Sequence, residues 1–177
     1  MSRFTSFTLA SFTLATLLLT GCKETSTAEL NTTTEPAAAT WLLASAPEDA
    51  KSVSEAKASA KEGEQIVLRG RIGGRLEPLT EGSPVFTMMD LAVPACGTEP
   101  DDHCRTPWDY CCETPETITA NSATVQIMDA HGHPISESPT ARGLAALDEV
   151  IVVGTVAARP SENVLTIQAT GIYRVGG

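Results

Sequence analysis

The sequence predicts a mainly β domain in which five strands form a barrel and a short helix lies between the third and fourth strands. Three observations lead to this prediction. Apolar and polar residues alternate over 65–72, which is typical of a strand with one buried face. The segments follow the order three strands, one helix, two strands. Glycines at 70, 73 and 74 permit the bending that closes a sheet into a barrel.

The first 21 residues have the architecture of an export signal, with one early positive charge, Arg3, followed by an apolar core. The apolar stretch 4–19 is shorter than the roughly 20 residues that span a bilayer as a helix. The tetrapeptide LTGC, residues 19–22, resembles the lipobox of bacterial lipoproteins. The resemblance implies cleavage before Cys22, a lipid anchor on Cys22, and a periplasm-facing place in the bacterial cell envelope. An ordinary secretory signal or an uncleaved anchor is the alternative. Lys23, in place of an aspartate, favours the outer membrane by the same resemblance.

The charge of the exported chain disfavours nucleic acid as a partner. Removing residues 1–21 takes Arg3 from the 12 basic side chains, which leaves 11 against 22 acidic ones and a formal charge of −11. A chain this acidic is repelled by phosphate backbones and by anionic membrane surfaces. We therefore expect a body held at the membrane by its lipid alone, with an envelope protein as its partner.

Residues 22–47 are predicted to form a flexible tether, because this stretch is rich in Thr, Ala and Glu and lacks a hydrophobic period over 23–40. The domain is predicted over 48–177. It opens with a helix over 53–61, since Ser52 and Glu55 have the spacing of a capping box. The apolar face of this helix is narrow, so we expect weak packing on the body.

The five strands are predicted from short apolar or alternating segments bounded by turn residues. Between the third and fourth, Ser138 and Pro139 are typical of a helix start. The predicted strands occupy 65–75, 84–93, 122–132, 149–159 and 163–175. This order resembles the OB-fold superfamily, and the resemblance covers about 65–175. A β-sandwich is the structural alternative. The stretches RGRIGG (69–74) and PWDYCC (107–112) also resemble an uncharacterised group of secreted bacterial proteins, which implies no activity.

A cysteine-rich insertion is predicted over 94–115, after the second strand. It holds four of the five cysteines, and export favours their oxidation. The Cα atoms of adjacent cysteines lie only about 3.8 Å apart. A relaxed disulfide needs a Cα separation of at least about 4.4 Å, so Cys111 and Cys112 are not expected to pair with each other. Two pairings remain open: 96–111 with 104–112, or 96–112 with 104–111. Either would hold the loop with two disulfide bonds among Cys96, Cys104, Cys111 and Cys112.

Two other hypotheses, a metal site and a redox centre, involve the same sulfur atoms. Four thiolates, or three with His103, could hold Zn or Cu. In that case Cys111 and Cys112 would both reach an ion only with local backbone distortion. A transient bond between Cys111 and Cys112 would instead make a thiol–disulfide redox centre. With the disulfides formed, no cofactor is expected.

The predicted function is that of a non-catalytic binding or interaction module of the cell envelope. An OB barrel often binds ligands across its sheet face, and the stapled loop would complete that contact surface. No catalytic motif occurs in the sequence. The candidate ligand-binding residues are Trp108, Asp109, Tyr110, Arg69 and Arg71. The first alternative is an envelope metal-binding protein, and the second is a thiol–disulfide redox protein.

Overall fold

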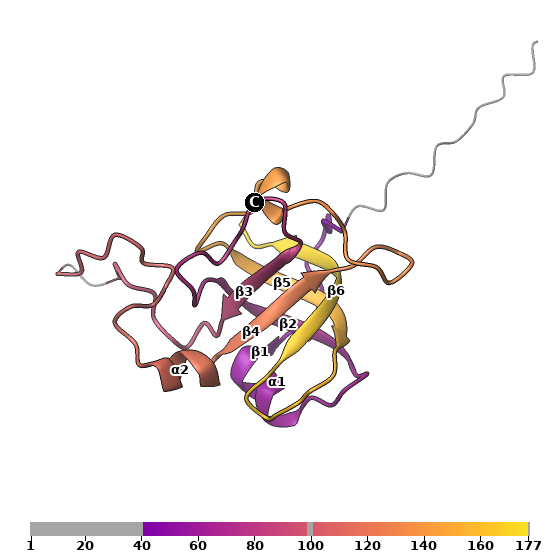
Figure 1. Ribbon diagram of the computed structural model, residues 1–177, viewed down its shortest axis with the longest axis horizontal. Coiled ribbons are helices and arrows are strands. Elements are labelled where there is room, and N and C mark those ends of the chain that lie inside the picture. Colours follow the sequence, from indigo (N-terminus) through magenta and orange to yellow (C-terminus); the bar gives the residue numbers. More distant parts are fainter. Residues whose placement is uncertain (1–40, 99–100, 177) are drawn as a thin grey trace, which may run out of the picture. The chain divides into compact units, whose positions relative to one another are not determined.

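The computed structural model describes residues 41–98 and 101–176, which form a closed β-barrel with few helices (Figure 1). The sheet order is β1-β2-β3-β4-β6-β5, and β5 pairs back onto β2. The strands are β1 (Lys51–Ser52), β2 (Gln65–Ile72), β3 (Val85–Met89), β4 (Ser122–Ile127), β5 (Glu149–Val156) and β6 (Thr166–Arg174). Five strands close the barrel and β1 adds to its edge, so the predicted mainly β, five-stranded barrel is confirmed.

The core lies inside this barrel. Along β2 the side chains at Ile66, Leu68 and Ile72 are buried and alternate with more exposed ones, as the period-two pattern predicts. β2 pairs with β5 over most of its length and reaches β3 only through Arg71 and Ile72. The sheet therefore turns sharply between β2 and β3.

Gly70 permits this turn. A Cβ atom at this position would lie 2.5 Å from the carbonyl oxygen of Met89 and 2.6 Å from the side chain of Met88. No real side chain fits at such distances, so the approach of β3 to β2 depends on a residue without a Cβ.

Helix α1 (Val53–Ser59) packs more tightly than its narrow apolar face predicts. The Ser52–Glu55 capping box is present, and the helix ends two residues before the predicted end at residue 61. Val53 and Ala56 are fully buried and belong to the main core. The expectation of weak packing was wrong because small side chains let the helix approach the barrel closely, and close approach buries them completely.

The other short helices differ from expectation. Between β4 and β5 the chain makes only one 3₁₀ turn, η1 (Pro139–Arg142), which ends at Gly143 with a left-handed φ of 82°. Helix α2 (Pro115–Ala120) was not predicted, although Thr114 caps it and Pro115 is its first residue. It begins where the cysteine-rich insertion ends.

The described body already includes residues 41–47, which were predicted to belong to the tether, before the predicted start of the domain at residue 48. Trp41 is buried, and its carbonyl oxygen accepts a 2.7 Å hydrogen bond from the N–H of Ile172. The N–H of Leu43 donates to the carbonyl of Ile172 at 2.8 Å, so this segment runs alongside β6. The predicted signal peptide, Cys22 and residues 23–40 of the tether lie outside the described residues. Within the described ranges, no helix is long and apolar enough to cross a membrane.

Candidate metal centre

The four cysteines lie in the loop between β3 and α2, which corresponds to the predicted insertion. We call its described part, residues 90–98 and 101–114, the cysteine lobe. The lobe is closed at its base, where the N–H of Asp90 donates to the carbonyl of Asn121 at 2.8 Å. The Asp90 carboxylate also accepts hydrogen bonds from the N–H groups of Ser54 and Ala92, at 2.7 and 2.9 Å. The lobe is thereby tied to Asn121, which directly precedes β4, and to the start of α1.

A tight turn precedes the paired cysteines. The N–H of Asp109 donates to the carbonyl of Thr106 at 3.0 Å, and the Thr106 hydroxyl donates to the Asp109 carboxylate at 2.6 Å. The other oxygen of that carboxylate accepts from the N–H of Cys111 at 2.8 Å. These bonds explain why a Thr-Pro-x-Asp sequence forms a turn here. They also fix the direction in which the chain enters Cys111.

Tyr110 supplies the backbone distortion that two adjacent ligands need. Its φ is 60°, a left-handed value that is uncommon for a bulky residue and costs about 1–3 kcal/mol. The side chain is fully buried against Met89, Val93 and Ala95. Burial of the ring stabilises the strained backbone, and the chain reverses so that Cys111 and Cys112 both face the same centre.

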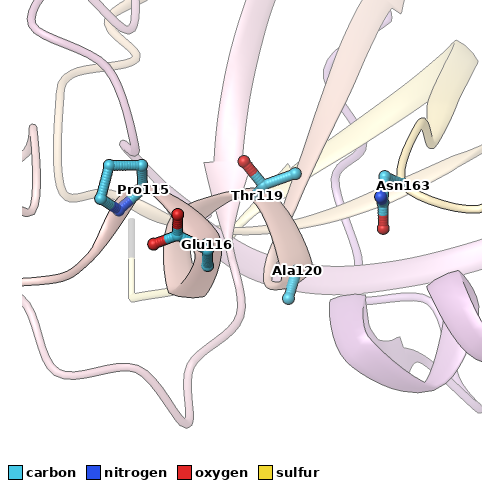
Figure 2. Close-up of a pocket in the computed structure, with 5 residues that line it drawn as sticks. All are labelled: Pro115, Glu116, Thr119, Ala120 and Asn163. Carbon is cyan, nitrogen blue, oxygen red and sulfur yellow. The ribbon is translucent and has the colours of Figure 1, made fainter.

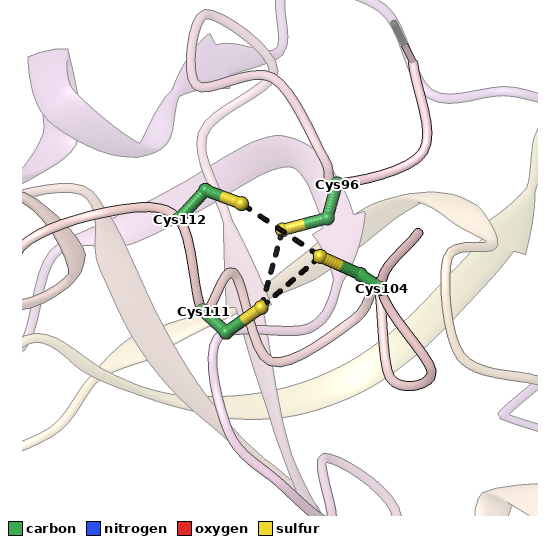
Figure 3. A group of neighbouring side chains, drawn as sticks. All are labelled: Cys96, Cys104, Cys111 and Cys112. Carbon is green, nitrogen blue, oxygen red and sulfur yellow. Dashed lines mark hydrogen bonds between the residues drawn. The ribbon is translucent and has the colours of Figure 1, made fainter. Parts of the chain in front are cut away.

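The four sulfur atoms converge on one point. The Sγ atoms of Cys96, Cys104, Cys111 and Cys112 all lie within 4.8 Å of one another. The distances are 3.2 Å for Cys104–Cys111 and 3.7 Å for both Cys96–Cys111 and Cys104–Cys112. Figure 3 shows the side chains pointing inward from separate parts of the lobe. A tetrahedral ion with sulfur ligands at about 2.3 Å requires sulfur atoms roughly 3.8 Å apart, so the spacing fits such an ion.

The predicted disulfides are not formed in this structure. All four described cysteines are free thiols, and even the 3.2 Å separation of Cys104 and Cys111 exceeds the bond length of about 2.05 Å. Both pairings predicted from sequence remain compatible with the arrangement, since every sulfur atom lies near the other three. His103, the alternative ligand, is exposed and does not belong to the group.

The thiols have different acidities because they share hydrogen bonds. Burial by itself would raise the pKa of Cys96, but the N–H of Cys112 and the three other thiols donate to its sulfur and hold its pKa below the ordinary value. Donation to Cys104 and Cys96 raises the pKa of Cys111. Donation to Cys96 and Cys104 raises the pKa of Cys112 to about 11. Cys96 is thus more acidic than Cys111 and Cys112, and a cation that replaced the shared protons would be bound with their release.

The stretches RGRIGG (69–74) and PWDYCC (107–112), which are far apart in the sequence, are in contact. The N–H of Gly74 donates to the carbonyl of Trp108 at 2.7 Å. A Cβ on Gly73 would lie 2.8 Å from the Tyr110 ring, so this glycine leaves room for the ring. The Trp108 indole N–H donates to the carbonyl of Leu76 at 3.0 Å. The lobe is therefore seated on the loop that follows β2.

The five candidate ligand-binding residues do not form one site. Tyr110 is buried and Asp109 is used within its turn. The Arg69 guanidinium pairs with Glu149 across the β2–β5 pair. Burial raises the pKa of Tyr110, and the neighbouring Arg71 offsets part of that rise. Trp108 is half-buried against Leu76, which leaves it as the one aromatic candidate with a solvent-facing part.

Two other places in the described residues have fewer groups that could bind a ligand or a metal ion. Asp129 accepts hydrogen bonds from the N–H groups of His131 and His133 at 2.8 and 2.9 Å, so these residues form a turn.

A shallow depression lies beside α2 (Figure 2). It is lined by Pro115, Glu116, Thr119, Ala120 and Asn163. Glu116 is its one ionisable side chain, which leaves it without a catalytic or metal-binding group of residues.

Comparison with known proteins gives no family. No family model matches the chain, and no curated protein matches it. Among solved structures, the chain is similar to the hypothetical protein ygiW from E. coli, with a TM-score of 0.38 and 16% sequence identity over 72% of this chain and 90% of that one. A likeness of this strength carries no conclusion about function.

Proposed function

We propose that the protein is a metal-binding lipoprotein of the bacterial cell envelope, whose cysteine lobe holds one zinc ion through four thiolates. The observation that supports this proposal is the convergence of four Sγ atoms within 4.8 Å of one another. If these thiol side chains served only to pack, we would not expect them to point toward one common centre from three separate points of a loop. A divalent cation among four thiolates offsets part of their negative charge, and its bonds to all four hold the loop together.

Zinc is preferred to copper on geometric grounds. Four sulfur ligands in a tetrahedron are typical of zinc or iron centres. Thiolates also bind Cu(I), because both are soft, but a tetrahedron of four sulfur atoms is not the arrangement that indicates Cu(I). The separations of 3.2 and 3.7 Å are near the value for a zinc ion bound by sulfur. Iron is the competing metal for the same four ligands, and metal analysis separates the two.

The site is suited to a non-catalytic role. Catalytic zinc sites have three protein ligands and keep one position open for water or substrate, whereas four cysteines fill the coordination sphere. Zinc would then do what the predicted disulfides were expected to do, namely hold the lobe against the barrel. The ordered lobe, with half-buried Trp108 on its surface, would offer a contact surface to an envelope protein.

The place in the cell follows from the N-terminal sequence. LTGC at residues 19–22 supports lipidation of Cys22, and the preceding apolar core supports export. Incorporation of labelled palmitate into the wild-type chain and its absence from Cys22→Ser is the expected result. Equal labelling of both chains would contradict the lipid anchor.

Metal content tests the centre directly. The full-length protein is extracted from membranes in detergent, with thiols kept reduced and without chelators, and its metals are measured by mass spectrometry. We expect one zinc per chain, and Co²⁺ substitution should give the absorption of a tetrahedral thiolate complex. Cys111→Ser with Cys112→Ser should lose the metal, while the control His131→Ala with His133→Ala should keep it. Absence of metal from reduced protein that binds none on titration would overturn the proposal.

A further inference from the structure

We propose that the metal centre is a redox switch: a disulfide donor oxidises Cys104 and Cys111 to one disulfide bond, and the zinc ion is released. This inference rests on the proposed zinc centre and adds its regulation. These sulfur atoms can either bind a metal ion or form disulfide bonds. Both are open to them because the four side chains that would surround the ion are also close enough to one another to form disulfides.

The four ligands differ in their access to solvent. Cys96 is buried, Cys104 is intermediate, and Cys111 and Cys112 are exposed. A disulfide donor from solution therefore meets Cys111 or Cys112 first and cannot reach Cys96 directly. An inert structural zinc site would be expected to keep its ligand residues buried, whereas two of the four ligand residues here, Cys111 and Cys112, are exposed.

Distance selects the second sulfur. The sulfur of Cys111 lies 3.2 Å from that of Cys104 and 3.7 Å from that of Cys96, and the sulfur of Cys112 lies 3.7 Å from that of Cys104. A bond between Cys111 and Cys112 themselves is disfavoured, since adjacent Cα atoms are about 3.8 Å apart and a relaxed disulfide spans at least about 4.4 Å. After a donor has reacted with exposed Cys111, the sulfur of Cys104 therefore needs to move only a short distance to form the disulfide.

The reaction is two successive thiol–disulfide exchanges. The thiolate of Cys111 leaves the zinc ion and attacks one sulfur of the donor, RSSR, which forms a mixed disulfide and expels one RS⁻. The thiolate of Cys104 then leaves the zinc ion and attacks the Cys111 sulfur, which expels the second RS⁻. The two cysteines together lose two electrons, and the donor gains them.

Loss of two ligands releases the ion. Only the thiolates of Cys96 and Cys112 then remain on zinc, and water fills the vacated positions. A second equivalent of donor joins Cys96 to Cys112 in the same manner, which gives the pairing 96–112 with 104–111. In total, one Zn²⁺ bound by four thiolates and two RSSR become two protein disulfides, four RS⁻ and a free Zn²⁺, so that sulfur atoms, electrons and charge balance.

The rest of the lobe is built to survive the exchange. Tyr110 is held by Met89, Val93 and Ala95, and the Gly74–Trp108 hydrogen bond lies outside the cluster. In the oxidised form, disulfide bonds replace the zinc ion as the links among the cysteines. We therefore expect the lobe to remain seated on the barrel in both states, so that reduction and added zinc restore the starting form.

The test starts from full-length protein already shown to hold one zinc ion. Oxidised glutathione is added in steps under anaerobic conditions, released zinc is followed with a chromophoric chelator, and free thiols are counted. Each sample is quenched with acid and alkylated, and its disulfides are mapped by peptide mass spectrometry. We expect full release of zinc as two thiols are lost, with Cys104–Cys111 as the first disulfide. Dithiothreitol followed by zinc should restore binding.

Two variants sharpen the result. Cys112→Ser keeps the reacting pair and should still form Cys104–Cys111, whereas Cys111→Ser should slow disulfide formation at least several-fold. Zinc that stays bound in excess oxidised glutathione, zinc released with four thiols still free, or a first disulfide between other cysteines would each overturn the switch. All three results presuppose bound zinc and leave the metal centre itself standing, whereas a chain that binds no zinc fails earlier, at the metal analysis.

Discussion

The backbone N–H of Gly74 donates a 2.7 Å hydrogen bond to the carbonyl oxygen of Trp108, which joins the loop after β2 to the cysteine lobe. The two residues are far apart in the sequence, and each belongs to a stretch of unusual composition. Their contact means that the barrel and the lobe are folded against each other, so changes on the barrel side can alter the sulfur centre.

Gly73→Ala should disturb the lobe from the barrel side. The added methyl group would lie 2.8 Å from the Tyr110 ring and 2.9 Å from the Trp108 carbonyl, so one of them must move. We expect a loss of about 1–3 kcal/mol in the free energy of unfolding and weaker zinc binding. Chemical denaturation and zinc competition measure the two effects. Gly82→Ala is the control, because its φ of 72° strains alanine while nothing lies within 4 Å. It should lower stability without weakening zinc binding; equal zinc affinities of both variants would contradict the coupling.

Arg159→Lys should loosen the end of α1. The guanidinium donates to four carbonyl oxygens, those of Lys57, Ala60, Glu162 and Val164, at 2.6–3.1 Å. Lysine cannot span this set, so we expect a loss of about 1.5–3 kcal/mol, the range for hydrogen bonds to a charged group. Arg142→Lys is the matched control, since Arg142 makes a surface ion pair with Glu137 and should cost less than about 1 kcal/mol. Thermal unfolding of both variants checks the difference, and similar shifts would contradict it.

Asp90 should contribute to the acid sensitivity of the fold. Burial would raise the pKa of its carboxyl group, but the N–H groups of Ala92 and Ser54 outweigh burial and hold the pKa below its usual value. A carboxyl with a lowered folded pKa stabilises the protein above its unfolded pKa of about 3.9, and this stability is lost as the pH falls through the folded pKa.

Asp90→Asn removes this contribution. We expect a loss of about 1–3 kcal/mol at neutral pH and a smaller further loss between about pH 5 and 2 than in the wild type. Urea unfolding across this range measures both. Glu81→Gln, at an exposed position, is the control and should retain the wild-type pH profile. A steeper acid loss in Asp90→Asn than in the wild type would contradict the assignment.

Removal of zinc should loosen the lobe and leave the barrel intact. Hydrogen exchange measured before and after chelation should accelerate in residues 101–114, which carry three of the four sulfur ligands. The strands β2, β5 and β6 should keep their protection, because their ladder does not involve the lobe. Accelerated exchange throughout the barrel would show that the ion supports the whole domain.

The barrel was predictable because its signals are local. The period-two pattern in β2 and the capping box at Ser52 and Glu55 each lie within a few residues, and both are present in the structure. The burial of α1 was not predictable, because Ala56 carries too little apolar surface to reveal how closely the helix approaches the barrel. The same holds for Trp41, whose place beside β6 depends on a pairing far away in the sequence.

The site was predictable in composition and not in form. The sequence identifies Cys96, Cys104, Cys111 and Cys112 as one group, and the structure brings all four together. It does not reveal the positive φ of Tyr110, because nothing in the residue type favours that conformation; the buried pocket around the ring selects it. The backbone at Tyr110 thus provides the local distortion that two adjacent ligands were expected to need.

The two tryptophans of the chain provide separate optical reports on its two parts. Trp41 is enclosed in the core beside β6, and Trp108 lies half-exposed in the lobe. Fluorescence from Trp41 should therefore be blue-shifted and follow barrel unfolding, while emission from Trp108 should be red-shifted, open to quenching by iodide, and responsive to events at the sulfur atoms. Trp41→Phe and Trp108→Phe would each leave one reporter, so that a single cuvette measurement distinguishes a change in the lobe from a change in the barrel.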